Sequence, residues 1–406
     1  MLQPRSLTRY LHAIFSKANV TDSIYDSHKQ GLVDILKCAP TKAAVAAALA
    51  SWSSIDFEAE VMKRNLCAVA VRSFEEADRH PHARQTVNNE SVYVRKIGDA
   101  PRRILSGTEF ARALDGIRVL DLTRVLAGPV CGRTLAAHGA DTLLVTSPNL
   151  PSLPLLDMDT SRGKRTTQLD LRDPKDKETL QSLVKDADVF LQAYRPGGLQ
   201  GLGFGPEEVA KARPGIVYGT LSAYGFSGAL KDAKGFDSLL QAIGGMNVAE
   251  AQAYKDYVLA NGGNVNDFPP HRSLPMQALD HATGYLLAFG IISALCRTIT
   301  EGGSYEVHVS LGATLHWVRS LGYLSPEEAY KNGEPLPPRG VPLDTEVAGF
   351  STKIEQAVPD AGVQSGPVYH NITAIRHAAV MSKTKVCIGE APMRLDAHLP
   401  VWLKRP

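Results

Sequence analysis

The residue with the clearest chemical potential is Asp280, which stands near the start of a long apolar run from Met276 to Cys296. The run has helical composition with apolar residues on every face, so the sequence predicts a buried helix. A carboxylate in the first helical turn lies near unpaired N–H groups and the positive end of the helix dipole, which keep it ionised. Two interpretations stay open: Asp280 is a nucleophile, or it is only an N-terminal cap.

A series of short motifs precedes this helix and gives Asp280 a context. Leu-Asp-Gly-Ile-Arg-Val begins at Leu114, Arg-Gly-Lys-Arg at Arg162, Tyr-Arg-Pro-Gly at Tyr194 and Gly-Phe-Asp at Gly235, and Ala-Leu-Asp-His-Ala-Thr-Gly surrounds Asp280. Their order resembles the class III CoA-transferases of the CaiB/BaiF type, a superfamily that includes formyl-CoA transferase and α-methylacyl-CoA racemase. The resemblance covers roughly half of the chain.

The resemblance implies an acyl-CoA-utilising enzyme with Asp280 as its nucleophile and no permanently bound cofactor or metal. Coenzyme A or an acyl-CoA is then a substrate, together with a carboxylic acid acceptor. Contacts with CoA are implied for the following residues: Val125, Leu126, Ala127, Arg162, Lys164, Tyr194, Arg195 and Tyr224.

Each group of these residues also has a plainer interpretation. Arg162 and Lys164 are placed to bind the phosphates of CoA, yet a basic cluster of this kind is often only a solvated loop. Tyr194 and Tyr224 either bracket the adenine or pantetheine of CoA or pack in the core. His80 and His82 have no further ligand cluster nearby and are expected in a surface loop, not in a metal site.

The chemistry that we expect is attack of the Asp280 carboxylate on a thioester to form a mixed anhydride. An alternative is an α-methylacyl-CoA racemase or epimerase, which needs an acid and a base on opposite sides of one carbon. In that branch a histidine occupies the position of Phe236, which cannot move a proton. A catalytically silent CoA-binding protein is the third possibility.

Composition is compatible with these interpretations and excludes others. The chain has 406 residues, of which 44% are hydrophobic and 21% charged, as in an ordinary soluble enzyme. The formal net charge of +2 gives no electrostatic reason to expect binding to nucleic acid or to a membrane. Five scattered cysteines suit a reducing compartment, and we expect a cytoplasmic protein.

From Leu114 onward, short apolar strands alternate with helices of moderate length. This pattern predicts an α/β fold, with a Rossmann-like parallel sheet covered by helices on both faces. Ligands of such sheets bind at the carboxyl ends of the strands. The loops after Leu122, Leu191 and Leu221 lie at those ends, and they hold three of the motifs.

We divide the chain into N-terminal helices with a small α+β domain at 1–110, a CoA-transferase-type domain at 111–325, and a C-terminal loop, hairpin and tail at 326–406. In the family that the chain resembles, the small domain follows the Rossmann-like domain, whereas here it precedes it. The order is therefore rearranged, either by permutation or because the chain is one half of a duplicated ancestor.

The two ends of the chain carry further expectations. Residues 1–18 have the basic, amphipathic pattern of a weak mitochondrial presequence or of an ordinary surface helix. Near the other end, residues 327–342 read as a loop, and the glycine-rich loop that covers the family's active site is not evident. Hydrolysis, altered activity or loss of activity therefore stays open. The resemblance also implies an interlocked homodimer.

Overall fold

The computed structural model describes residues 13–15, 19–22, 26–86, 88–104, 110–266, 268–333, 337, 340–355, 371–387 and 389–405. These residues group into two compact units, and each unit is assembled from separate stretches of the chain. Unit 1 comprises the described residues of Met1–Asn89, Ala223–Leu279 and Ser310–Pro335. Unit 2 comprises those of Glu90–Ser222, Asp280–Val309 and Leu336–Pro406.

Unit 2 is built on a seven-stranded sheet with the strand order β4-β10-β9-β8-β5-β6-β7. The strands are β4 (Tyr93–Gly98), β5 (Arg118–Leu122), β6 (Asp141–Thr146), β7 (Arg165–Gln168), β8 (Val189–Gln192), β9 (Val217–Ser222) and β10 (Ser304–Ser310). β7, β6, β5, β8 and β9 pair in parallel, and β4 joins the edge antiparallel to β10. The predicted parallel sheet is confirmed.

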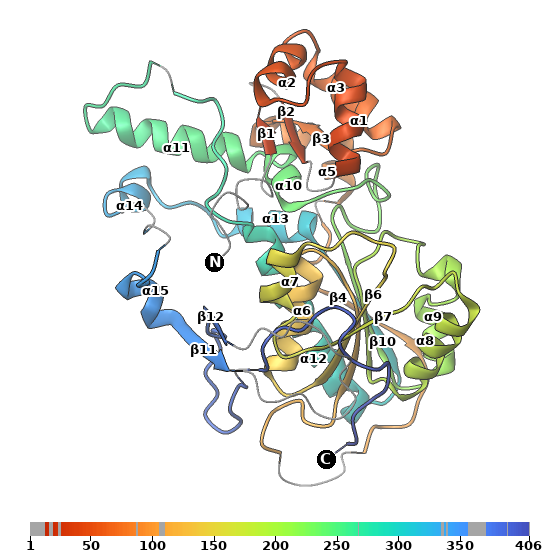
Figure 1. Ribbon diagram of the computed structural model, residues 1–406. Helices are drawn as coiled ribbons and strands as arrows, with labels where there is room; N and C mark the ends of the chain where they lie inside the picture. Colours follow the sequence, from red (N-terminus) through yellow and green to blue (C-terminus); the bar gives the residue numbers. More distant parts are fainter. Residues whose placement is uncertain are drawn as a thin grey trace. The chain divides into compact units, whose positions relative to one another are not determined.

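Helices cover both faces of this sheet (Figure 1). α6 (Ala127–Ala137), α7 (Pro154–Thr160) and α12 (Ala278–Thr300) lie on one side, and α8 (Pro174–Asp186) and α9 (Pro206–Ala212) lie on the other. Unit 2 also contains the short 3-10 helix Gln200–Leu202, α15 (Thr345–Phe350), and the antiparallel pair β11 (Ser351–Glu355) and β12 (Asn371–Ile375). The fold class is therefore α/β, as the alternation of strands and helices predicted.

The apolar strands of unit 2 explain why the sheet forms. The side chains of β5, β6 and β8 are almost all buried, as expected for strands with helices on both faces. Phe190 of β8 is fully buried and stacks on Tyr218 of β9, with 5.1 Å between the ring centroids. Trp402, beyond the last described strand, packs against the same core and donates a hydrogen bond to the carbonyl of Leu183 at 3.0 Å.

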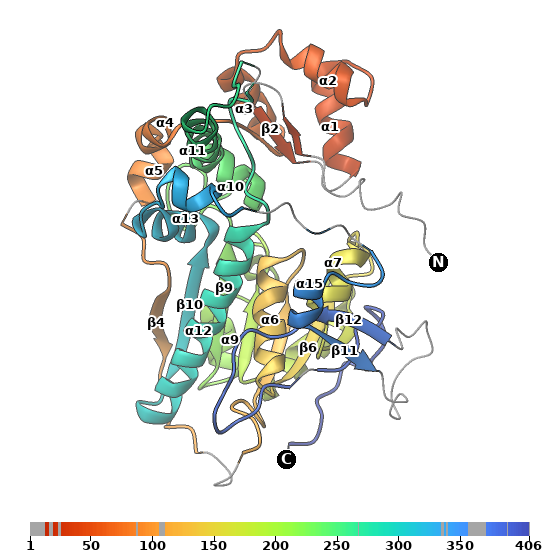
Figure 2. The ribbon, with the colours of Figure 1, turned by 90° about the vertical axis from the view of Figure 1, so that its left-hand side faces the viewer.

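Unit 1 combines a small antiparallel sheet with helices (Figure 2). Its strands are β1 (Ala13–Phe15), β2 (Asn19–Asp22) and β3 (Ala68–Ala70). Its helices are α1 (Asp26–Leu36), α2 (Lys42–Leu49), α3 (Ser54–Lys63), α4 (Phe74–Arg79), α5 (Pro81–Thr86), α10 (Asp237–Ile243), α11 (Met246–Ala260), α13 (Leu311–Ser320) and α14 (Pro326–Tyr330). The helix expected over 1–18 is not seen at 13–15, which pair as β1 with β2; the rest of that stretch lies outside the described residues.

The two units cut across the three contiguous domains that we expected from the sequence. β4 lies in the stretch assigned to the N-terminal domain, yet it completes the edge of the unit 2 sheet. α10, α11 and α13 lie in the stretch assigned to the Rossmann-like domain, yet they belong to unit 1. Each unit is built from stretches that are distant in sequence. The composition of one stretch does not show with which distant stretch it packs. The hairpin expected at 362–369 lies outside the described residues.

Among the described residues one helix, α12, is long and apolar enough to cross a membrane by length and composition. Half of its most apolar window is buried inside the protein, as in the core helix of a globular protein. Gly219 of β9 makes room for it, since a Cβ there would lie 2.7 Å from Cδ1 of Ile291.

We predict that Phe190→Ala lowers the free energy of unfolding by about 3–5 kcal/mol, because it removes a fully buried ring from between packed neighbours. Chemical denaturation followed by circular dichroism measures this loss. Phe289→Ala is the matched control, since the Phe289 ring is 64% exposed and its removal leaves no buried cavity. Equal losses for the two variants would contradict the core assignment.

Candidate active site

The turn between β5 and α6 is the most constrained piece of backbone in unit 2. Val125 has a φ of 72°, in the left-handed region that a β-branched residue rarely enters. Leu126 then forms the N-cap of α6, without a hydrogen bond from its side chain to the helix. The backbone N–H groups of the first turn of α6 therefore have no side-chain cap. Strain of this kind is retained where the surrounding structure fixes the backbone, which is common at functional sites.

The helix that carries Asp280 packs directly against this turn. A Cβ on Gly284 of α12 would lie 2.5 Å from the carbonyl oxygen of Ala127 and 2.9 Å from Cβ of Val130. Only glycine permits this approach of the two helices. Asp280 precedes Gly284 by four residues, so both lie on the same side of α12. The half-buried Asp280 therefore belongs to the part of α12 that meets the start of α6.

A buried ion pair lies beneath the same turn. The ammonium group of Lys164 donates to Oδ2 of Asp121 at 2.8 Å and to the carbonyl oxygen of Pro129 at 2.9 Å. Both charged side chains are fully buried. Thr123 donates from its hydroxyl to the other oxygen of Asp121 at 2.5 Å. Lys164 thus connects strand β5 to the first turn of α6.

This placement differs from the phosphate contact that the resemblance implied for Lys164. Its ammonium group has two acceptors inside the protein, and a phosphate in solvent cannot reach it unless that network breaks. Gly132 is needed for the arrangement, since a Cβ there would lie 2.0 Å from Oδ2 of Asp121. The geometry gives Lys164 the role of positioning the turn.

Arg162 lies close to Lys164 in sequence but in another environment. Its guanidinium pairs with Asp159 at 2.7 Å and donates to the carbonyl oxygen of Ile375 at 3.1 Å. Burial lowers the pKa of Arg162, and the nearby Asp159 partly offsets this. The side chain is 9% exposed, so it is not the solvated loop residue of the plainer interpretation.

The tyrosines and Arg195 divide between the two units. Tyr194 is partly buried against the core of unit 2, while its neighbour Arg195 is exposed. Tyr224 belongs to unit 1 and is buried there, with its ring 5.7 Å from that of His82. Burial raises the pKa of the Tyr224 hydroxyl far above its usual range. Of the two interpretations of Tyr224, these surroundings favour packing in the core.

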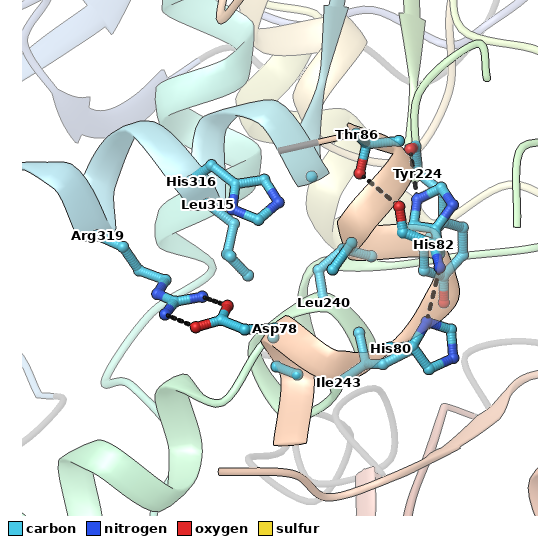
Figure 3. Close-up of a pocket in the computed structure, with 14 residues that line it drawn as sticks. Asp78, His80, His82, Thr86, Tyr224, Leu240, Ile243, Leu315, His316 and Arg319 are labelled. Carbon is cyan, nitrogen blue, oxygen red and sulfur yellow. Dashed lines mark hydrogen bonds and ion pairs between the residues drawn. The ribbon is translucent and has the colours of Figure 1, made fainter. Parts of the chain in front are cut away.

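A small pocket also lies in unit 1, among α4, α5, α10 and α13 (Figure 3). Leu240, Ile243 and Leu315 line it together with His316, and the Asp78–Arg319 ion pair closes one side at 2.7 Å. Its surface is mostly apolar, and Asp280 is not among its lining residues.

Of the two N-terminal histidines, His80 lies in the bend between α4 and α5, whereas His82 does not lie in the surface loop that we expected. His82 is buried in α5, where Nδ1 accepts from the backbone of Leu230 and Nε2 bonds to the carbonyl oxygen of Tyr224. His80 ends α4, and burial lowers the pKa of both imidazoles. Within the described ranges no three His, Cys, Asp or Glu side chains gather in an arrangement that could hold a metal ion.

The positions of Phe236 and His281 give little support to a racemase, which must transfer a proton to and from a substrate carbon. Phe236, at the position where racemases have a histidine, is the N-cap of α10 in unit 1. His281 follows Asp280 on α12, and burial with the positive charge of Arg133 lowers its pKa.

The site also contains residues that sequence reasoning missed. Asp121 is one of them, although a lone carboxylate within Val-Leu-Asp-Leu is itself a signal of a buried ion pair. Arg133 and Asp159 are isolated charges on helices and carried no signal. The left-handed conformation of Val125 has no sequence signal either, because valine disfavours it.

Comparison with known proteins identifies the family to which the chain belongs. The model of the family described as CoA-transferase family III matches residues 114–340, which is more than half of the chain. The chain therefore belongs to CoA-transferase family III. The family assignment made from the motifs is confirmed.

Curated relatives match over about half of the chain. Acetyl-coenzyme A transferase nodX of Hypoxylon pulicicidum is 33% identical over 216 residues, which cover 52% of this chain and 34% of that protein. Probable fatty acyl-CoA transferase Rv3272 of Mycobacterium tuberculosis is 31% identical, with 50% and 51% covered. Formyl-CoA:oxalate CoA-transferase of Afipia carboxidovorans is 31% identical, with 50% and 47% covered. The chain spans a third to a half of the length of these relatives.

Solved structures of the family are similar as well. A CAIB/BAIF family protein from Brucella suis is 25% identical, with a TM-score of 0.45, and the match covers 55% of this chain and 60% of that one. A hypothetical protein, Rv3272, from Mycobacterium tuberculosis is 27% identical, with a TM-score of 0.43, and the match covers 52% and 57%.

We predict that Lys164→Met destabilises the protein by about 3–5 kcal/mol, because it leaves Asp121 charged and buried without its partner. Denaturant titration measures the change. The double variant Asp121→Asn/Lys164→Met should recover much of the loss, since it removes both charges. A Lys164→Met variant as stable as the parent would show that the pair does not hold the β5–α6 turn.

Proposed function

We propose that this protein transfers CoA between carboxylic acids through an acyl anhydride on Asp280. Membership of CoA-transferase family III supports the reaction class. The observation that carries the assignment to Asp280 is its place one helical turn before Gly284, where α12 meets the strained start of α6. A nucleophile there has fixed backbone around it and uncapped N–H groups within the same unit.

The chemistry needs only the side-chain carboxylate and the thiol of CoA. Asp280 attacks the thioester carbonyl, the C–S bond breaks, and CoA leaves as the thiolate, so that a mixed anhydride remains on the enzyme. The thiolate then attacks the aspartyl carbonyl and releases the first acid as its carboxylate. The acceptor carboxylate attacks the resulting aspartyl thioester and displaces the CoA thiolate, so that a second mixed anhydride forms. The thiolate finally attacks the acyl carbonyl of this anhydride, which releases the new acyl-CoA and the free Asp280 carboxylate.

CoA itself is proposed to lie along the β5–α6 turn and the loop after β8. Val125, Leu126 and Ala127 would supply backbone contacts, since the first turn of α6 has no side-chain cap. Arg195 is exposed next to Tyr194 at the end of β8, where ligands of parallel sheets bind. We propose that Arg162 binds an oxyanion of the ligand. Lys164 does not contact CoA in this proposal but holds the β5–α6 turn in position.

The assembly and location of the protein stay predictions. A homodimer follows from the resemblance to the family, and a cytoplasmic location follows from the scattered cysteines. Sedimentation velocity of the full chain tests the homodimer. The mass obtained for a dimer is twice the chain mass of 43.8 kDa.

We predict that Asp280→Asn lowers CoA transfer at least about 1,000-fold, as the loss of a nucleophile does. Asn caps a helix about as well as Asp, so a residue that only capped α12 would tolerate this change. Intact-protein mass spectrometry with a panel of acyl-CoAs and hydroxylamine as a trap should find a hydroxamate at Asp280 in the parent and none in the variant.

Asp173→Asn is the matched control, since Asp173 is the exposed N-cap of α8 in the same unit. Its activity should equal that of the parent. Retention of CoA transfer by Asp280→Asn would contradict the proposal. Incorporation of solvent deuterium at the α-carbon without release of CoA would favour a racemase instead.

A further inference from the structure

Two arginines of unit 2 converge on a single carboxylate. Arg133 of α6 and Arg162 after α7 both form ion pairs with Asp159, at the end of α7. The arginine side chains are only 13% and 9% exposed, whereas that of Asp159 is 44% exposed. Two buried positive charges thus share one negative charge, and that negative charge lies on the solvent side.

Further polar rings surround this pair of arginines. His281 of α12 is half-buried within the electrostatic reach of Arg133 and Asp159, and no other described group is hydrogen-bonded to its ring. Tyr285, one turn further along α12, has its ring 6.4 Å from that of His377. α6, α7 and α12 lie on the same side of the sheet in both views (Figures 1 and 2).

The charges of this cluster do not balance. Burial lowers the pKa of Arg162, of His281 and of His377, the last to about 4, and the positive charge of Arg133 lowers all three further. His138 and Arg162 also lower the pKa of His377. Asp159 is the acid that opposes this effect for Arg162 and His281. The histidines are therefore neutral near pH 7, and the two guanidiniums keep an excess of positive charge.

We propose that Arg133 and Arg162 form a binding site for an oxyanion, either a carboxylate or a phosphate group of a ligand. Planar guanidiniums match the paired oxygens of both groups, and they already hold a carboxylate, that of Asp159. A ligand oxyanion would displace the half-exposed Asp159 side chain and leave the buried arginines in place.

The position of this site relates it to Asp280. His281 follows Asp280 directly, so their Cα atoms are about 3.8 Å apart. His281 is within the electrostatic reach of Arg133 and Asp159, so the oxyanion site is near the start of α12. The ligand is either an acid with a second anionic group or a molecule with a phosphate group, as in CoA. Binding is independent of turnover, so this inference and the proposed transferase activity can fail separately.

The test is isothermal titration calorimetry of the full chain with inorganic phosphate and with succinate. We expect Arg133→Gln to weaken binding about ten-fold, because one charged hydrogen-bond donor is lost. Asp159→Asn should tighten it, because the competing negative charge is removed. The matched control is Arg103→Gln, since Arg103 is 15% exposed and pairs with the buried Asp188 elsewhere in unit 2.

The opposite signs of the two variants separate a ligand site from a structural ion pair. A structural pair would lose stability in both variants, and neither would bind the anion more tightly. Displacement of bound phosphate by succinate but not by CoA assigns the site to an acidic substrate. Displacement by CoA but not by 3′-dephospho-CoA assigns it to the CoA phosphate. Absence of anion binding by the parent, or equal affinity in Arg133→Gln, would overturn the proposal, and Asp159→Asn keeps the test valid if Arg133→Gln does not fold.

Discussion

The buried ion pair of Lys164 and Asp121 is the constraint on which the rest of the candidate site depends. A charge without water is costly unless a partner of opposite charge and further hydrogen bonds surround it. Here one ammonium group satisfies both a carboxylate of β5 and a carbonyl of α6. The first turn of α6 is therefore fixed relative to the sheet, and with it the strained backbone at Val125.

Small residues allow the elements around this pair to approach. Gly132 leaves room for the Asp121 carboxylate, and Gly284 lets α12 contact the carbonyl oxygen of Ala127. The close contact determines where the first turn of α12 lies, and Asp280 is in that turn. The position of the proposed nucleophile thus depends on glycines that have no chemistry of their own.

Much of the fold is predictable from the sequence, because the pattern of neighbouring residues determines where strands and helices form. Apolar strands alternating with helices predict a parallel sheet, and the structure contains it. The order of motifs identifies the family. Pairing across long separations is not local: the partner of Lys164 is a carboxylate 43 residues earlier, and β4 joins β10 more than 200 residues later. The phosphate contact of Lys164 was implied by the resemblance of its motif to the family, and neither the motif nor its charge shows whether the side chain faces water or another element.

The division of each unit among separate stretches also has a consequence for the synthesis of the chain. Residues up to Asn89 emerge from the ribosome before α10 and α13, which complete unit 1 and follow only after the 133 residues of Glu90–Ser222. Until then the apolar sides of the first helices lack their native cover. Contacts between distant segments form slowly, and exposed apolar surface promotes aggregation. The first helices of unit 1 therefore keep apolar side chains exposed during synthesis until the stretch from Ala223 onward has been made.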